Sequence, residues 1–148
     1  MTTNSFRNDR SFLSNYYPSP IVIEPGHVVY DTAEHLYQTC KTDNPHYQEW
    51  IRVATKPGEA KRRGRRVPIR ADWEKIKLDV MRDVLRLKFD QHPGLKQKLL
   101  DTGDEPLLEI NAWRRTQFWS IDTSGVGENW LGKLLMELRA YYREDGKS

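Results

Sequence analysis

The segment EHLYQTCK, residues 34–41, carries a carboxylate, an amide and an amine at a spacing typical of one helix face. At about 100° per residue, Glu34, Gln38 and Lys41 lie within roughly 60° of one another if the segment is helical. A core face would be apolar, and a solvated face usually scatters its charges, so this grouping suggests a polar site. The alternative is a solvent-facing helix with an ion pair worth roughly 0.5 kcal/mol or less.

A basic run, KRRGRR at residues 61–66, packs five cations into six residues. Arginine forks bind phosphate through two parallel hydrogen bonds, and a glycine among them lets the backbone approach a ligand. Lys61, Gly64 and Arg65 therefore suggest an anion site with phosphate as its natural ligand. Such a run is also typical of solvated surface, and that alternative stays open here.

Tryptophans accompany the basic run and a later polar stretch. Trp73 follows the run, whereas Trp113 and Trp119 flank Thr116. Aromatic faces beside cations suit a nucleotide, because the base stacks on the ring while the cations hold the phosphate. Ordinary core packing is the alternative for each tryptophan. Together, the three groups indicate a small molecule that bears both a base and a phosphate.

Short elements must position these side chains. Residues 10–31 carry short β signals, including a hairpin with a Pro-Gly turn, and a helix capped by Asp31 or Thr32 follows to Lys41. Further helices are expected at 45–54, 56–66 (Pro57 near its start), 71–92 (capped by Asp72), 95–103 and 129–144, and strands at 106–111 and 118–122. We therefore expect one α+β domain over residues 1–148, mainly helical with a small sheet.

Composition excludes several classes of protein. The 148 residues are 37% hydrophobic, with five Trp and seven Tyr, which suits a compact domain and excludes a disordered chain. The net charge of +3 does not by itself imply nucleic acid. The one cysteine, Cys40, excludes a disulfide framework and is more typical of buried packing than of a nucleophile.

Metal, cofactor and membrane functions also have no support in the sequence. The four histidines are scattered, without metal-ligand spacing, so we expect neither a metal nor another cofactor. The first ten residues lack the apolar core of a signal peptide, and no stretch approaches 18 apolar residues. A cytoplasmic protein is expected.

Five longer motifs occur in order: FLSNYYPSP, YDTAEHLYQTCK, PGEAKRRGRRVPIRADWEKIKLDVMRDVLRLKF, LLDTGDEPLLEIN and GENWLGKLLMELR. Their order and spacing resemble the NADAR family (NAD- and ADP-ribose-associated, also called YbiA-like or RibX-like). The resemblance covers about residues 6–143. Each motif alone is weak, but five in sequence are specific, and they imply a YbiA-like fold.

The resemblance implies cleavage of a C1–N bond in a riboside. Some family members resemble glycosidases that hydrolyse phosphorylated pyrimidine ribosides of the riboflavin pathway, and others remove ADP-ribose from guanine bases. Cleavage at C1 develops oxocarbenium-like charge, which a carboxylate stabilises, and Glu34 matches the family's glutamate. A lysine can instead attack the ring-opened sugar as a Schiff base, and either Lys41 or Lys61 could supply that amine.

The remaining site residues are carried over from the family's motifs. Lys61 and Arg65 match an AKxxGR pattern that would hold the phosphate, and Gln38 would orient the sugar hydroxyls. The other substrate-binding residues that the resemblance implies are Ser14, Asn15, Trp73, Thr116, Trp119 and Asn129. The implied partner is a phosphorylated riboside or an ADP-ribosylated nucleobase, with nucleic acid as a possible substrate.

One stretch departs from the family. Its members usually carry an Asp in a D-x-[FY]-W-G pattern, whereas alignment on Phe118-Trp119 places Thr116 at the Asp position and Ser120 at the Gly position. A shift of one residue would place Arg115 there, and Asp122 could compensate only along a different loop path. A threonine cannot act as a base near neutral pH.

Two alternatives to the enzyme therefore stand. The first is a module that binds ADP-ribose or a related nucleotide with weak or no catalysis, because the usual Asp is replaced near Thr116. The second is a nucleic-acid-binding protein that uses the basic run at residues 61–66.

Overall fold

The computed structural model describes residues 6–112 and 117–146. The chain divides into two compact units, and each is described by itself. The first, residues 15–92, is called the α1–α4 unit, and the second, residues 1–14 with 93–148, the α5–α6 unit.

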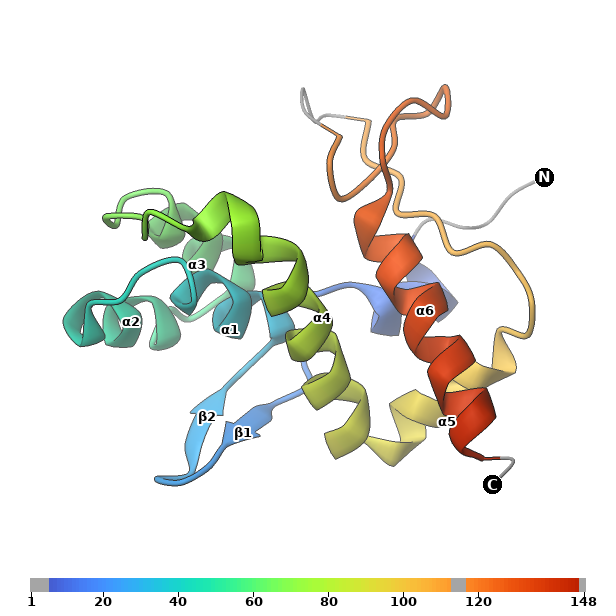
Figure 1. Cartoon of the computed structure of the whole chain (residues 1–148), viewed down its shortest axis with the longest axis horizontal. Helices are drawn as coiled ribbons and strands as arrows, with labels where there is room; N and C mark the ends of the chain where they lie inside the picture. Colours follow the sequence, from blue (N-terminus) through green and yellow to red (C-terminus); the bar gives the residue numbers. More distant parts are fainter. Residues whose placement is uncertain (1–5, 113–116, 147–148) are drawn as a thin grey trace. The chain divides into compact units, whose positions relative to one another are not determined.

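The α1–α4 unit combines a hairpin with four helices (Figure 1). Strands β1 (Ile21–Ile23) and β2 (Val28–Tyr30) are antiparallel, with Val22 opposite Val29. Its helices are α1 (Ala33–Thr39), α2 (Pro45–Arg52), α3 (Pro57–Gly64) and α4 (Trp73–Gln91). Helix α1 packs against each of the other three helices, so it lies at the centre of the unit.

The α5–α6 unit contains the 3-10 helix η1 (Asn8–Leu13), α5 (Pro93–Asp101) and α6 (Trp130–Asp145). Helices α5 and α6 pack against each other. The buried face of α6 carries Leu131, Leu134, Leu135, Leu138 and Tyr142. Helix α6 therefore supplies much of the apolar core of this unit.

The helical predictions and the α+β class with a small sheet are confirmed. Thr32 caps α1, since its side chain accepts a hydrogen bond from the backbone N–H of His35. Asp72 precedes α4 without a side-chain capping bond, because its carboxylate accepts from Arg70 at 2.6 Å instead. Assignment of all 148 residues to one domain stays a prediction.

Three β predictions outside the hairpin are wrong. Part of the segment 10–20 forms η1, and the expected strands 106–111 and 118–122 reduce to isolated bridges that join Ile121 to Ile110 and to Gly127. The side chain of Asn129 instead forms hydrogen bonds with the backbone carbonyl of Leu107 and the backbone N–H of Glu109. An apolar run needs a partner strand along its whole length to form a ladder, and these runs have none within residues 6–112 and 117–146.

Lys88 on α4 is fully buried, and its ammonium group lies 5.2 Å from the ring centre of Phe89. Burial lowers the pKa of Lys88 from 10.5 to about 7. The unfolded chain therefore binds more protons than the folded chain between pH 7 and 10.5, so this group adds stability as pH rises through that window.

We expect the unfolding free energy of the wild type, relative to Lys88→Met, to rise by about 2 kcal/mol between pH 7 and 9. Denaturant titrations at both pH values measure this difference. Lys75→Met is the matched control, because Lys75 is exposed on the same helix. A difference that does not change with pH would contradict the buried position of the amine.

None of the helices in residues 6–112 and 117–146 has the length and apolar character needed to cross a bilayer.

Candidate active site

Helix α1 is buried along its whole length. The exposed fraction is 7% for Glu34 and 2% for Gln38. The alternative of a solvent-facing helix is therefore wrong for these two residues. Buried polar groups are costly unless hydrogen-bonded, so each needs an explanation from its contacts.

His35 has a structural explanation. Its Nε2 lies 2.8 Å from the carbonyl oxygen of Ala54, and its Nδ1 lies 2.8 Å from the hydroxyl of Thr32. A carbonyl only accepts, so Nε2 carries the proton and Nδ1 accepts from the threonine hydroxyl. Both ring nitrogens therefore help to hold α1 in place, which explains the burial of His35.

Glu34 and Gln38 form a directly bonded pair. The amide Nε2 of Gln38 donates to the carboxylate Oε2 of Glu34 at 2.5 Å. The residues are four apart on α1, so one helix turn sets their geometry. The amide fixes the orientation of the carboxylate, which is what a group that acts on one atom of a substrate requires.

Gly64 allows α3 to approach this pair. A Cβ atom at Gly64 would lie 2.0 Å from the Oε1 of Gln38, closer than any real contact. Lys61 precedes Gly64 by three residues and therefore lies on the same side of α3. Arg65 follows Gly64 directly as the C-cap. The sequence suggested that Gly64 lets the backbone approach a ligand. In the structure, Gly64 lets α3 pack closely against Gln38 of α1.

The basic run divides into two sets. Arg62 and Arg63 pair with Glu59, at 2.7 Å and 3.4 Å, and Arg63 also donates to the carbonyl of Trp50 at 2.6 Å. These two arginines are engaged within α2 and α3.

The second set comprises Lys61, Arg65 and Arg66, which form no ion pair within the described part of the chain. Arg65 and Arg66 are exposed, and Lys61 is half-buried. A ligand can recruit cations of this kind without first breaking an ion pair. The sequence alone could not separate the two sets, although Glu59 stands three and four residues before the engaged pair.

An aromatic pair lies beside the end of α1. The rings of Tyr37 and Trp73 are 5.2 Å apart and tilted by 57°, and the amine of Lys41 lies 5.9 Å from the Tyr37 ring centre. The carbonyl of Lys41 accepts from the backbone N–H of Arg70 at 2.9 Å. Tyr37 was missed by the sequence analysis, although it stands three residues after Glu34 on the same helix.

Asn15 lies against the first turn of α1. Its backbone carbonyl accepts from the N–H of Glu34 at 3.0 Å, and its side-chain Nδ2 donates to the sulfur of Met81 at 3.4 Å. Asn15 is 7% exposed, and its Oδ1 has no hydrogen-bond partner among the residues that the structure describes. The structure therefore places Asn15 next to Glu34, as a site residue requires.

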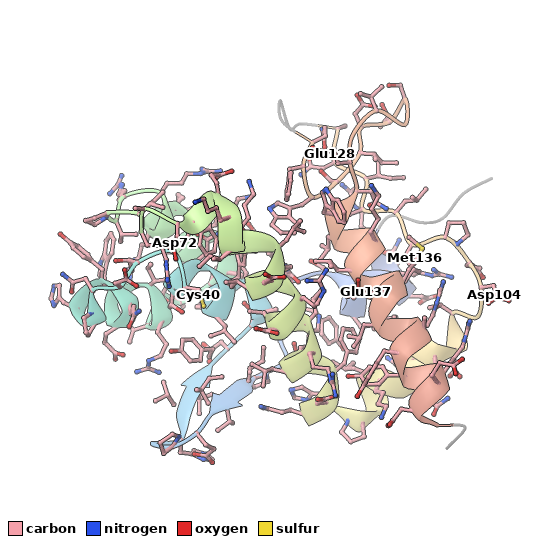
Figure 2. All side chains as sticks on the ribbon, viewed as in Figure 1. Cys40, Asp72, Asp104, Glu128, Met136 and Glu137 are labelled. Atoms are coloured by element: carbon pink, nitrogen blue, oxygen red, sulfur yellow. The ribbon has the colours of Figure 1, made fainter. Side chains whose placement is uncertain are left out.

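Cys40 lies in an environment that disfavours the reactive thiolate. It is half-buried at the end of α1 (Figure 2), and burial raises the pKa of its thiol. A thiol with a raised pKa holds less of the reactive thiolate at neutral pH. The interpretation of Cys40 as a packing residue is therefore supported.

The predicted residues Ser14, Trp119 and Asn129 lie in the α5–α6 unit. Ser14 ends η1, and Trp119 meets Phe118 edge-on with ring centres 4.8 Å apart. Asn129 accepts from the N–H of Glu109 and donates to the carbonyl of Leu107. The oxygen and the nitrogen of its amide both bond backbone groups, so Asn129 stabilises the loop at residues 107–109. The prediction for Thr116 lies outside the described residues.

Two carboxylates of the α5–α6 unit, Asp122 and Glu109, have shifted pKa values. Asp122 accepts from the hydroxyl of Ser124 and from the N–H groups of Val126 and Ser124. These bonds lower its pKa, so it is committed to a turn. Burial raises the pKa of Glu109 to about 7, a perturbation that the sequence pattern did not signal. Within the described ranges, no group of three or more His, Cys, Asp or Glu could hold a metal ion.

Comparison with known proteins identifies the family. The NADAR domain matches residues 3–143. N-glycosidase YbiA of Escherichia coli is 38% identical over 137 residues, which cover 91% of this chain and 83% of that protein. The NMR structure of E. coli YbiA matches with a TM-score of 0.85 at 33% identity, over 100% of this chain and 90% of that chain.

Two relatives carry riboflavin names. A riboflavin biosynthesis protein of Vibrio vulnificus is 35% identical over 92% of this chain but only 36% of its own length. The chloroplastic riboflavin biosynthesis protein PYRR of Zea mays is 37% identical over 86% of this chain and 22% of its own length. With the family match over nearly the whole chain, these relatives show that the chain belongs to the NADAR domain family and is an N-glycosidase-type hydrolase.

Proposed function

We propose that the protein hydrolyses the C1–N bond of a phosphorylated riboside, with Glu34 at the anomeric carbon and Lys61 and Arg65 at the phosphate. The observation that carries this proposal is the buried Glu34–Gln38 pair, which Gly64 joins to the helix that bears the uncommitted cations. A carboxylate and a set of cations on two packed helices suit the two ends of one sugar phosphate.

The chemistry follows from the groups present. As the C1–N bond breaks, positive charge develops on C1 and the ring oxygen, and the Glu34 carboxylate stabilises it. A water molecule adds to C1 and loses a proton to Glu34, and the departing base nitrogen takes up a proton from solvent. Glu34 then returns its proton to solvent. The products are the free base and ribose 5-phosphate. Gln38 acts as a positioning residue for the carboxylate.

A lysine route remains a second possibility within the same proposal. Attack of a lysine amine on C1 of the ring-opened sugar, with loss of the protonated base, would give a Schiff base, which water then hydrolyses to the free sugar and the amine. Lys41 lies beside Tyr37, and Lys61 stands three residues before Gly64 on α3, so both stay candidates. Borohydride added during turnover should leave a covalent sugar on one of them, and the absence of any adduct would favour direct hydrolysis.

As the specific substrate we favour the pyrimidine ribosyl phosphate of the riboflavin pathway, because relatives with riboflavin names align with nearly the whole chain. Purified protein should release ribose 5-phosphate from this intermediate. A second candidate, ADP-ribosylated guanine, should instead release ADP-ribose. Calorimetric binding of ADP-ribose without either turnover would support the binding module, and steeply salt-dependent duplex binding would support a nucleic-acid substrate. We also propose a cytoplasmic location.

Removing either proposed phosphate ligand should chiefly weaken substrate affinity. We expect Lys61→Ala and Arg65→Ala each to raise KM by roughly 10-fold, because a charge-assisted hydrogen bond is worth about 1.5–3 kcal/mol. Steady-state kinetics measures KM and kcat separately. Arg62→Ala is the control, because Arg62 sits on the same helix but pairs with Glu59. Unchanged KM in both variants would remove the phosphate assignment.

A further inference from the structure

Arg70 lies between α3 and α4, and the proposed reaction gives it no role. Its guanidinium forms a fork on Asp72, because Nε donates to Oδ1 at 2.6 Å and Nη2 donates to Oδ2 at 3.0 Å. The remaining nitrogen, Nη1, lies 3.4 Å from the carboxylate of Asp43. One side chain therefore joins the loop that follows α1 to the turn that precedes α4.

The backbone of Arg70 bonds two residues of the candidate site. Its N–H donates to the carbonyl of Lys41 at 2.9 Å, and its carbonyl accepts from the N–H of Trp73 at 3.2 Å. The N–H of Lys41 donates in turn to the carbonyl of Gln38 at 3.2 Å. Both backbone groups of Lys41 are thus held, one by its own helix and one by Arg70.

The side chain of Lys41 packs beside rings that also depend on Arg70. The Lys41 amine lies 5.9 Å from the centre of the Tyr37 ring, and the Tyr37 ring lies 5.2 Å from that of Trp73. A lysine amine sits on a flexible stem of four carbons, so its position depends on its backbone and on what the stem packs against. Arg70 fixes the first directly and the second through Trp73.

Direct contact with the substrate phosphate is the weaker interpretation of Arg70. Its fork already meets two carboxylates, whereas Lys61 and Arg65 form no ion pair within the described residues. An ionised phosphate would have to displace Asp43 or Asp72 to reach the fork. A purely structural ion pair is the other alternative, since exposed pairs often contribute little. The test must separate both alternatives from a role in positioning.

We propose that Arg70 is a positioning residue that fixes the amine of Lys41 for its attack on the sugar. This inference rests on the lysine route of the proposed function, with Lys41 as the amine. A reacting group that is misplaced by about 1 Å can cost roughly 10²-fold in rate. Loss of the Arg70 side chain should therefore lower kcat and leave the affinity for the substrate nearly unchanged.

Arg70→Met removes the fork and keeps a long side chain. We expect kcat to fall roughly 10-fold while KM stays within about twofold of the wild type, the pattern of a group that acts on the reacting atoms alone. Covalent sugar trapped on Lys41 by borohydride should fall by a similar factor. Arg62→Met is the matched control, because Arg62 also pairs with a carboxylate, that of Glu59 on its own helix. The control should keep both kinetic constants.

Two further variants separate positioning from charge and from stability. Arg70→Lys keeps the charge, but an ammonium cannot fork onto one carboxylate and reach a second, so kcat should recover only in part. On a Lys41→Ala background, Arg70→Met should cause no further loss of kcat, because the group that it positions is absent. Full recovery in Arg70→Lys, an additive loss on the Lys41→Ala background, unchanged kcat in Arg70→Met, or a raised KM with unchanged kcat would each overturn the inference.

A spectroscopic measurement without substrate reports the position of Lys41 directly. In labelled wild-type protein, the Lys41 side chain should show resonances shifted by the Tyr37 ring. In Arg70→Met, these resonances should move toward those of an exposed lysine, while unchanged backbone resonances of α2 and α3 show that the unit is folded. Lys41 resonances that do not move in the folded variant would overturn the inference.

The same preparations distinguish failure of the inference from failure of the proposed function. Turnover by the wild type without any adduct on Lys41 would overturn the role of Arg70 and leave hydrolysis by Glu34 standing. Lys41 resonances that depend on Arg70 in a protein without turnover would support the positioning contact and overturn the proposed reaction.

Discussion

Glu34→Gln should lower kcat by roughly 10²–10⁴-fold, the usual cost of losing a proton-transfer group, while substrate binding persists. The substitution keeps the shape of the side chain but removes its charge and its capacity to accept a proton. Gln38 can still donate to the new amide oxygen at position 34, so the packing of α1 should survive. Single-turnover kinetics and calorimetry on the same substrate measure the two quantities separately.

Glu59→Gln provides the matched control for this experiment. Glu59 undergoes the same chemical change on α3 of the same unit, where its carboxylate pairs with Arg62 and Arg63. Its loss should leave kcat within about twofold of the wild type, because surface ion pairs contribute little. Turnover by Glu34→Gln equal to that of the control would rule out Glu34 as the catalytic carboxylate.

The grouping of Glu34 and Gln38 could be read from sequence because helix geometry is local. Residues four apart on a helix are neighbours whatever surrounds them, and the Thr32 cap defines where α1 begins. The burial of that pair could not be read, since it depends on contacts with α2, α3 and α4, which are distant in the chain. A polar stripe on a helix looks alike in sequence whether water or another helix covers it.

The physical roles of other positions depend on tertiary contacts, which the sequence does not show. Gly64 stands near the end of α3, where glycine is common for local reasons, and only the fold shows that it faces Gln38. Asn129 stays a predicted substrate-binding residue, and the structure adds that its amide bonds the backbone of Leu107 and Glu109. The resemblance identified these positions, whereas the physical role of each required the partner that it contacts.

The sharpest structural test concerns Gly64 itself. Gly64→Ala should destabilise the protein by about 2–3 kcal/mol and lower kcat, because the new methyl group must displace the amide of Gln38 that orients Glu34. Thermal unfolding and steady-state kinetics measure the two effects. Gly58→Ala on the same helix is the matched control: a Cβ there would meet nothing closer than 3.9 Å, so stability should stay within about 1 kcal/mol of the wild type.

A double substitution separates the steric effect from the catalytic one. In Gly64→Ala/Gln38→Ser, the shorter side chain makes room for the methyl group but cannot supply the amide that reaches Glu34. Stability should therefore recover relative to Gly64→Ala, while kcat stays low. Recovery of both quantities would mean that the bond from Gln38 does not position the carboxylate. A single Gly64→Ala variant as stable and active as Gly58→Ala would contradict the close packing of α1 on α3, and with it the link between the carboxylate and the cations of α3.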